Sequence, residues 1–291
     1  ASVGGGIPII RPMHMCLAAN EIDEIAGILN GTTNFILTKM IKEGISFDAA
    51  LKMAQDLGYA ERNPAADVEG HDACRKICIL ASLAFGRHVY PEYVHTEGIT
   101  KITLEDVAYA ENWGGVIKLI GEAKRIPERK QIECMVAPAF VHNESQLANI
   151  DDVFNGVLVR GNATGDVVFY GKGAGKLPTA SAVVADVIHE AKVSGTSTSL
   201  TWADSTDNFV LPYDEVESAF YIRISSDDEA FAKGEVSALF AGASFLSRTA
   251  KPESELAFVT EPLSGGLLSE KLACLEAEGA QVLSVIRVAD C

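Results

Sequence analysis

The 291-residue sequence predicts an α+β protein built on a mixed sheet with helices on one face. Strand-like segments are numerous and only partly interleaved with helical ones, which argues against a regular alternation of strand and helix. The composition shifts to Ser, Thr, Gly and Asp over residues 193–208, and a second succession of elements follows. We therefore predict a first domain over residues 1–192, a linker over 193–208 and a second domain over 209–291.

The first domain opens with clear local signals. The apolar stretch 22–29 predicts a strand that ends at the turn Asn30-Gly31, and a helix with apolar residues at helical spacing follows. Ser46 predicts the N-cap of the next helix and Gly58 its C-terminal end. The alanine-rich pattern of residues 73–85 is typical of a buried helix.

The later elements follow from alternating patterns, helical spacing and glycine-containing turns. In the first domain we predict helices over residues 104–110 and 179–192, and strands over 116–120, 132–141, 157–160 and 167–170. In the second we predict, in order, a strand over 219–225, a helix near 235–242, strands over 244–250 and 255–260, a helix over 267–278 and a strand over 281–288. This βαββαβ order is typical of a ferredoxin-like unit.

Composition narrows the class of function. Hydrophobic residues make up 48% and charged residues 22% of the chain, an ordinary globular composition, and the formal net charge is -16. No Lys/Arg-rich run is present to bind phosphates, which argues against a nucleic-acid partner. The sequence also lacks the roughly 18 to 20 consecutive apolar residues of a membrane span and the pattern of a signal peptide. We expect a cytoplasmic protein, without a membrane partner, that acts on a small metabolite.

The 6 cysteines are scattered and include no C-x-x-C pair. Cys74 and Cys78 could share a helix face, but two thiolates without a nearby histidine make a poor zinc site. We expect them to be reduced, buried thiols.

The segment 58–76 concentrates charge on a turn that runs into a helix. It contains the carboxylates of Glu61, Asp67, Glu69 and Asp72, followed by Lys76. If the segment after Gly70 is helical, Asp72 and Lys76 share one face, where carboxylates could bind an ammonium group and the lysine could handle a hydroxyl proton. Acidic residues are also favoured at a helix N-terminus, and exposed pairs of this spacing are common. Spacing alone favours this structural interpretation, and both remain open.

A glycine-rich segment, residues 171–181, lies between a predicted strand and a predicted helix. It is not a P-loop, because Leu177 stands where Ser or Thr is needed, and Lys176 replaces the third glycine of a dinucleotide fingerprint. A tight turn with Pro178 in the first helical turn explains it as well as ligand contact does. The chain starts without Met in another glycine-rich turn, and we expect it to be a piece of a longer protein.

Several segments, in this order and spacing, resemble homoserine dehydrogenases. The matching segments are residues 2–9, 27–34, 58–61, 67–76, 173–175 and 178–180. The resemblance covers the family's substrate-binding and dimerisation region, and the second domain resembles the ACT domain of many bacterial members. It implies a homodimer and NAD(P)-dependent interconversion of L-homoserine and L-aspartate 4-semialdehyde, a step toward threonine, methionine and isoleucine.

The resemblance also assigns residues. Asp72 and Lys76 correspond to the catalytic pair at the reacting hydroxyl, and the substrate-binding positions are Glu61, Asp67, Gly58 and Tyr59, the two carboxylates holding the ammonium group. The positions facing the cofactor's nicotinamide end are Gly173, Gly175 and Thr179. The main-chain carbonyls of Val3, Gly5 and Ile7 correspond to those that bind a monovalent cation such as Na⁺.

Some family features are absent from these residues. The nucleotide-binding domain, a second catalytic lysine and the glutamate of the cation site would all precede Ala1, so the chain alone is expected to be inactive and its preference for NAD or NADP stays open. Asn63 stands where the family usually has Asp. Residues 227–231 lack the Pro and Gly of the usual ACT loop, which argues against threonine as an effector. The alternative class is a non-enzymatic, amino-acid-sensing dimer.

Overall fold

The computed structural model describes residues 2–193, 200–205 and 209–291. Most of the predicted linker, 193–208, lies outside the described residues. The helices are α1 (Ile10–Met15), α2 (Gly31–Glu43), α3 (Phe47–Asp56), α4 (Ala65–Val68), α5 (His71–Phe85), α6 (Leu104–Trp113), α7 (Lys176–Lys192), α8 (Glu229–Leu239) and α9 (Gly265–Ala277), with 3₁₀ turns η1 (Pro91–Tyr93) and η2 (Tyr213–Glu215).

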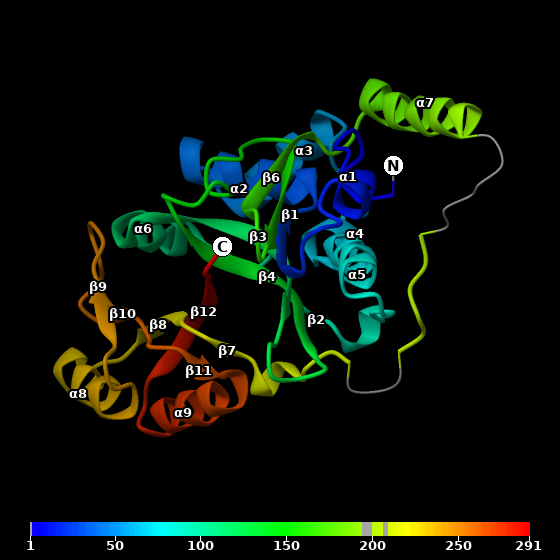
Figure 1. The fold of residues 1–291 in the computed structure, drawn as a ribbon. Coiled ribbons are helices and arrows are strands. Elements are labelled where there is room, and N and C mark those ends of the chain that lie inside the picture. The colour runs from blue at the N-terminus through cyan, green and yellow to red at the C-terminus, as the bar shows by residue number, and fades with distance from the viewer. Residues whose placement is uncertain (1, 194–199, 206–208) are drawn as a thin grey trace.

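The strands are β1 (Ile22–Ile28), β2 (His95–Thr96), β3 (Gly115–Arg125), β4 (Ile132–His142), β5 (Phe154–Gly161), β6 (Gly165–Lys172), β7 (Glu217–Ser218), β8 (Phe220–Ser225), β9 (Ser244–Leu246), β10 (Glu255–Val259), β11 (Leu263–Ser264) and β12 (Gln281–Ala289). In the described part of the chain, one sheet runs in the order β6-β5-β1-β3-β4-β12-β8-β10-β9, with β2 beside β4 (Figure 1). The β4–β12 and β2–β4 pairs are parallel and the others antiparallel, so the predicted mixed sheet is confirmed.

The two faces of this sheet are covered differently. Ile25 and Leu119 face a core shared with α2 and α5, whereas Ala26 and Ile120, one residue further along each strand, belong to a core on the opposite face. That second core is closed by Leu147, Ala148 and Ile150 of the loop before β5, not by a helix. At the far end of the sheet, α8 and α9 pack against a separate core that includes Ile222 and Phe258.

Lys118, on β3, fixes the loop before β5 through a hydrogen bond. Its buried Nζ donates to the Ile150 carbonyl at 2.6 Å, and burial lowers the pKa of Lys118 to about 8. The side-chain amide of Asn34 on α2 donates to the carbonyls of Ile150 and Asp152, each at 3.0 Å. A loop without regular structure is thereby fixed by donors from a helix and a strand.

Local capping signals located several boundaries correctly. Ser46 caps α3 through a hydrogen bond from the Ala49 N–H at 3.3 Å, as predicted. The predicted helix near 235–242 is wrong in its bounds, because Asp228 accepts from the Phe231 N–H and starts α8 at Glu229.

The predicted strand 244–250 also extends too far. It ends at Leu246, because Ala250 has φ 56° and the intervening Arg248 turns toward Glu255. The two-residue strands β7 and β11 pair with each other and carry too short a pattern to be predicted.

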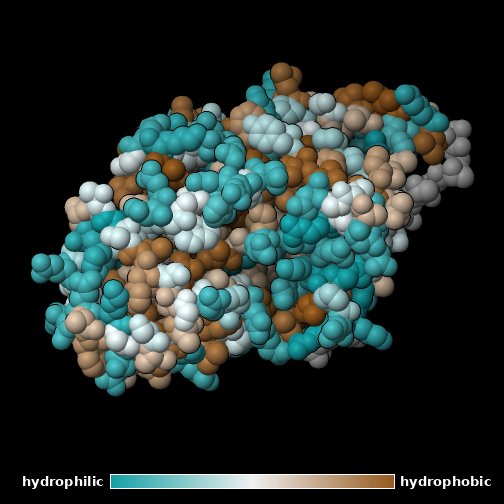
Figure 2. Space-filling view, turned by 60° about the vertical axis from the view of Figure 1, so that its left-hand side comes forward, coloured by the Kyte–Doolittle hydropathy of each residue, from teal (hydrophilic) through white to brown (hydrophobic). Residues whose placement is uncertain are grey.

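Helix α7 projects from the body of the molecule and has no buried residue (Figure 1). Its exposed apolar side chains are Leu177, Val183, Val184, Val187 and Ile188, and Figure 2 shows hydrophobic residues along it. An ion pair at 2.6 Å joins Asp186 of α7 to Arg11 of α1. Among the described residues, no helix has both the length and the apolar composition that crossing a bilayer requires.

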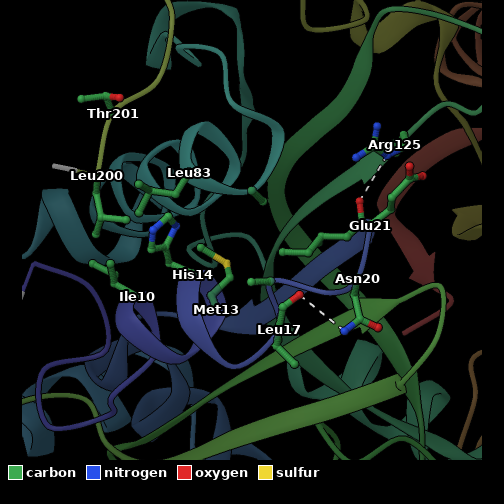
Figure 3. Close-up of a pocket in the computed structure, with 13 residues that line it drawn as sticks. Ile10, Met13, His14, Leu17, Asn20, Glu21, Leu83, Arg125, Leu200 and Thr201 are labelled. Carbon is green, nitrogen blue, oxygen red and sulfur yellow. Dashed lines mark hydrogen bonds between the residues drawn. The ribbon is translucent and has the colours of Figure 1, made fainter. Parts of the chain in front are cut away.

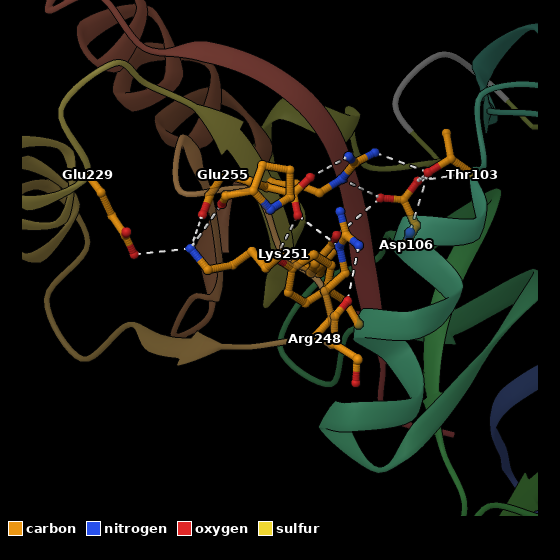
Figure 4. Close-up of polar contacts among 11 residues, drawn as sticks. Thr103, Asp106, Glu229, Arg248, Lys251 and Glu255 are labelled. Carbon is orange, nitrogen blue, oxygen red and sulfur yellow. Dashed lines mark hydrogen bonds and ion pairs between the residues drawn. The ribbon is translucent and has the colours of Figure 1, made fainter.

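A buried ionic network joins α6 to the C-terminal strands (Figure 4). Asp106, fully buried on α6, accepts hydrogen bonds from Arg223 at 3.0 Å and Tyr221 at 3.1 Å, both on β8. Arg223 also donates to Glu255 on β10 at 3.0 Å, and Arg248 donates to the same carboxylate at 2.9 Å. Each buried charge thus has an opposite charge within hydrogen-bond distance, which offsets the cost of removing it from water.

Replacing Arg223 with methionine should lower the free energy of unfolding by about 3–5 kcal/mol, because two carboxylates would stay buried without their shared partner. Urea unfolding measures this loss. The matched control is Arg129→Met, since the Arg129–Glu215 pair is exposed and such pairs contribute about 0–1 kcal/mol. Equal, small losses in both variants would contradict a stabilising role for the network.

Candidate active site

Asn30 is the centre of a polar cluster at the junction of β1 and α2. As the N-cap of α2, its Oδ1 accepts from the Thr33 N–H at 2.9 Å. Its Nδ2 donates to Asp67 Oδ1 at 2.7 Å and to Asp72 Oδ2 at 2.8 Å. One buried amide therefore caps a helix and also holds two carboxylates together that would otherwise repel each other.

Lys76 lies one turn after Asp72 on α5, and the predicted pairing is confirmed. Its Nζ donates to Asp72 Oδ2 at 2.6 Å and to the Leu29 carbonyl at 2.9 Å. The side chains of Lys76 and Asp72 are 22% and 33% exposed, so the pair is neither sealed in the core nor an open surface ion pair. A protonated lysine has three N–H donors, and these two acceptors use two of them.

The environment of Asp67 raises the pKa of its carboxyl group. Burial is the largest cause, the hydrogen bond from Asn30 acts in the opposite direction, and the negative charges of Asp72 and Glu61 raise the pKa further. A cation arriving among these carboxylates would favour the charged form of Asp67.

The other predicted substrate residues lie on the loop between α3 and α4. Gly58, with φ 76°, follows the end of α3, and the next residue, Tyr59, accepts a hydrogen bond at its carbonyl from Thr32 Oγ1 at 2.8 Å. Glu61 is exposed. Glu69 is not brought into the cluster, because it pairs with His71 at 3.2 Å.

The predicted cofactor turn and the predicted cation turn lie against each other. The Gly6 N–H donates to the Lys172 carbonyl at 3.1 Å, and a Cβ placed on Gly5 would be 2.0 Å from the Gly173 carbonyl oxygen. Gly175, with φ 119°, precedes α7, where Thr179 is exposed. The Ile7 carbonyl, one of the predicted cation ligands with those of Val3 and Gly5, accepts from the Ile9 N–H at 2.9 Å.

In the described ranges, no three or more His, Cys, Asp or Glu side chains are grouped so that they could hold a metal ion. Cys74, Cys78 and Cys134 are buried free thiols, whereas Cys16 and Cys274 are exposed.

A cavity lies elsewhere in the fold. It has a volume of about 480 Å³, lies beside α1, and is lined by Met13, Leu17 and Leu83 with His14 and Arg125 (Figure 3). None of the predicted site residues lines it. The candidate site is thus a cluster of polar groups at a strand–helix junction, and it lies outside this cavity.

Sequence reasoning missed Asn30 as a site residue. Asn30-Gly31 was a turn signal, although an asparagine at a strand-to-helix junction is also a favoured N-cap whose amide N–H groups remain free to donate. Its partners are 37 and 42 residues away in sequence, so no local pattern identifies them.

We expect Asn30→Ala to raise the pKa of Asp67 further, because the hydrogen bond from Asn30 is the main interaction that favours the ionised form. Carboxyl carbon chemical shifts followed through a pH titration by NMR measure this change. Thr32→Val is the control, since Thr32 bonds the Tyr59 carbonyl and neither carboxylate. An unchanged or lower pKa in Asn30→Ala would show that the amide does not stabilise the charged pair.

The chain is similar to known proteins over most of its length. The family model "Homoserine dehydrogenase" matches residues 8–188. The chain is 44% identical to the homoserine dehydrogenase of Neisseria gonorrhoeae over 248 residues, which is 83% of this chain and 57% of that protein. A crystal structure of a homoserine dehydrogenase from Thiobacillus denitrificans matches with a TM-score of 0.87 and 38% identity, over 99% of this chain and 69% of that one.

A third match is a hyperthermophilic archaeal homoserine dehydrogenase mutant in complex with NADPH. Its TM-score is 0.57 and its identity 28%, over 68% of this chain and 56% of that one. The chain spans about half of the length of the first curated relatives, from 44% of the Synechocystis protein to 57% of the Neisseria protein. The matched fold, the family model and the ordered site segments together assign this chain to the homoserine dehydrogenase family.

Proposed function

We propose that this chain forms the substrate-binding and catalytic part of an enzyme that interconverts L-homoserine and L-aspartate 4-semialdehyde with NAD(P), in the synthesis of threonine, methionine and isoleucine. The observation that carries the proposal is the connected cluster of Asn30, Asp67, Asp72 and Lys76. It combines carboxylates for an ammonium group with a lysine for a hydroxyl group, the two polar ends of homoserine apart from its carboxylate.

Glu61 and Asp67 hold the substrate ammonium group in this proposal, with Gly58 and Tyr59 shaping the loop around it. The raised pKa of Asp67 supports this role, since a carboxylate among other negative charges gains most from a cationic partner. The link from Thr32 to the Tyr59 carbonyl fixes the loop relative to α2.

Asp72 and Lys76 act at the reacting carbon. Asp72 and the Leu29 carbonyl accept hydrogen bonds from the side-chain ammonium group of Lys76 and fix its position. The third N–H of Lys76 is left to bind the substrate hydroxyl oxygen. Oxidation of the alcohol releases a proton from the hydroxyl group and a hydride from the carbon that bears it. NAD(P)⁺, when bound, supplies the hydride acceptor. Lys76 holds the hydroxyl oxygen, and the hydroxyl proton passes to water or to the second lysine that the resemblance places in the nucleotide-binding domain.

The glycine turn before α7 is proposed to face the nicotinamide end of that cofactor. Gly175 is exposed at the start of a 17-residue helix, where backbone N–H groups are available, and Lys172 and Lys176 flank it. Gly173 and Thr179 complete the proposed contact. We also propose a monovalent cation on the carbonyls of Val3, Gly5 and Ile7, beside this turn.

We propose that residues 209–291 form an ACT-like regulatory domain. Residues 193–208 join it to the domain of residues 1–192. Its βαββαβ elements and the strand order β12-β8-β10-β9 support this proposal. Residues 227–231 contain neither Pro nor Gly, so we do not expect threonine to bind there. The functional form is proposed to be a homodimer.

Lys76→Ala should reduce the turnover of homoserine by the natural full-length protein about 100-fold or more, because a proton-handling group is lost. Steady-state absorbance of NAD(P)H measures this effect. Lys52→Ala is the matched control, since Lys52 forms an exposed pair with Asp56 at the same helical spacing on α3. Near-normal turnover in Lys76→Ala would remove Lys76 from the mechanism.

The 291-residue chain alone is expected not to oxidise homoserine.

Calorimetry on the 291-residue chain separates this function from a sensor. We expect homoserine to bind and Asp67→Asn to weaken that binding about 10-fold or more, because the ammonium group loses a charged partner. Asp186→Asn, on the projecting α7, is the control. A signal for threonine alone that Asp67→Asn leaves unchanged would favour an amino-acid sensor over the enzyme.

A further inference from the structure

Asn155, on β5, is a buried polar residue to which sequence reasoning gave no role. It is 2% exposed, and its Oδ1 has no hydrogen-bond partner within the described part of the chain. Among the described residues, the other buried side-chain atoms without a hydrogen-bond partner belong to Glu24 and Arg287, and each of these residues forms an ion pair through another atom. A buried acceptor without a partner costs about 1–3 kcal/mol, so stability does not explain an asparagine here.

Two glycines approach the Asn155 side chain from different segments. A Cβ placed on Gly173 would lie 2.2 Å from Asn155 Cγ and 2.4 Å from both Nδ2 and Oδ1. A Cβ on Gly31, the first residue of α2, would lie 3.4 Å from Oδ1 and 2.8 Å from the Val153 carbonyl oxygen. The amide is therefore in direct packing contact with the turn before α7 and lies close to the start of α2.

These contacts continue on the other side of the turn. A Cβ on Gly5 would lie 2.0 Å from the carbonyl oxygen of Gly173. Gly5, Gly173, Asn155 and Gly31 thus follow one another in space, and we call them the Asn155 stack. They come from the N-terminal turn, helix α2 and the β5–β6 hairpin, in which Asn155 pairs with Gly171, two residues before Gly173.

The stack ends beside the candidate active site. Gly31 follows Asn30, whose side chain binds both Asp67 and Asp72. A displacement of the turn at Gly173 relative to Gly31 would change the distance between the proposed cofactor turn and the proposed substrate carboxylates.

We propose that Asn155 is a positioning residue, whose amide keeps the turn at Gly173 at a fixed separation from the N-terminus of α2 and so aligns the cofactor with the substrate. The inference rests on the proposed function, because alignment matters only if both molecules bind. Hydride transfer is sensitive to such alignment, and a displacement of about 1 Å can reduce turnover about 100-fold.

The test compares single and double variants in the natural full-length protein. Gly173→Ala should lower kcat about 10-fold or more with little change in the KM for homoserine, since the new methyl group meets the Asn155 amide. Asn155→Ala should also lower kcat, because the turn loses its support. The double variant should exceed both single variants in kcat, because the methyl group on residue 173 then occupies the space that the amide leaves.

Gly171→Ala is the matched control, since a Cβ there would contact only Ile7, at 3.3 Å. If the wild type oxidises homoserine and both single variants keep its kcat, or if the double variant is no better than the worse single one, the positioning role is wrong and the proposed function stands.

If the wild type does not oxidise homoserine, the proposed function fails, and hydrogen exchange on the 291-residue chain decides the inference. Faster exchange of the amides of residues 31–33 and 173–175 in Asn155→Ala, absent in Gly171→Ala, supports the stack. Faster exchange at only one of these segments, or at neither, overturns it.

Discussion

The shared hydrogen-bond donor at Asn30 is the constraint around which the candidate site is organised. The carboxylates of Asp67 on α4 and Asp72 on α5 lie together at the end of β1, where both accept a hydrogen bond from Asn30. This shared donor offsets the repulsion between the two negative charges. Asn30 can supply it only because its Oδ1 caps α2 and thereby fixes the orientation of the amide. Lys76 on α5 binds Asp72, one of the two carboxylates that Asn30 holds, and Thr32, two residues after Asn30, bonds the Tyr59 carbonyl.

Two ion pairs of this fold differ in how deeply they are buried. Asp106 and Arg223 are sealed between α6 and β8, where neither solvent nor a small molecule reaches them, and their contribution is to fix one part of the chain on another. Asp72 and Lys76 remain partly exposed, so a ligand can exchange places with water. Burial, more than the type of residue, distinguishes the structural ion pair from the pair proposed for chemistry.

Signals that act within a few residues could be predicted from the sequence. The cap at Ser46, the strand 22–29 and the shared face of Asp72 and Lys76 depend on neighbours in the chain. The bridging role of Asn30 could not be predicted, because its partners are brought near by the tertiary fold alone. Helix α8 begins at Glu229, earlier than the predicted helix near 235–242. Asp228 is a local capping signal for this start, but the prediction rests on an apolar pattern that begins later.

Strand β12 lies in the interior of the sheet, between β4 and β8, although it is formed by residues 281–289 near the end of the chain. Chains are synthesised from the N-terminus, and a sheet with a missing interior strand exposes two unpaired edges. During synthesis, β4 and β8 are both made before β12, so neither can complete its pairing until residues 281–289 have been made. A chain cut before residue 281 would retain the residues of the candidate site, yet it would leave the neighbouring edges of β4 and β8 unpaired and open to association with other chains.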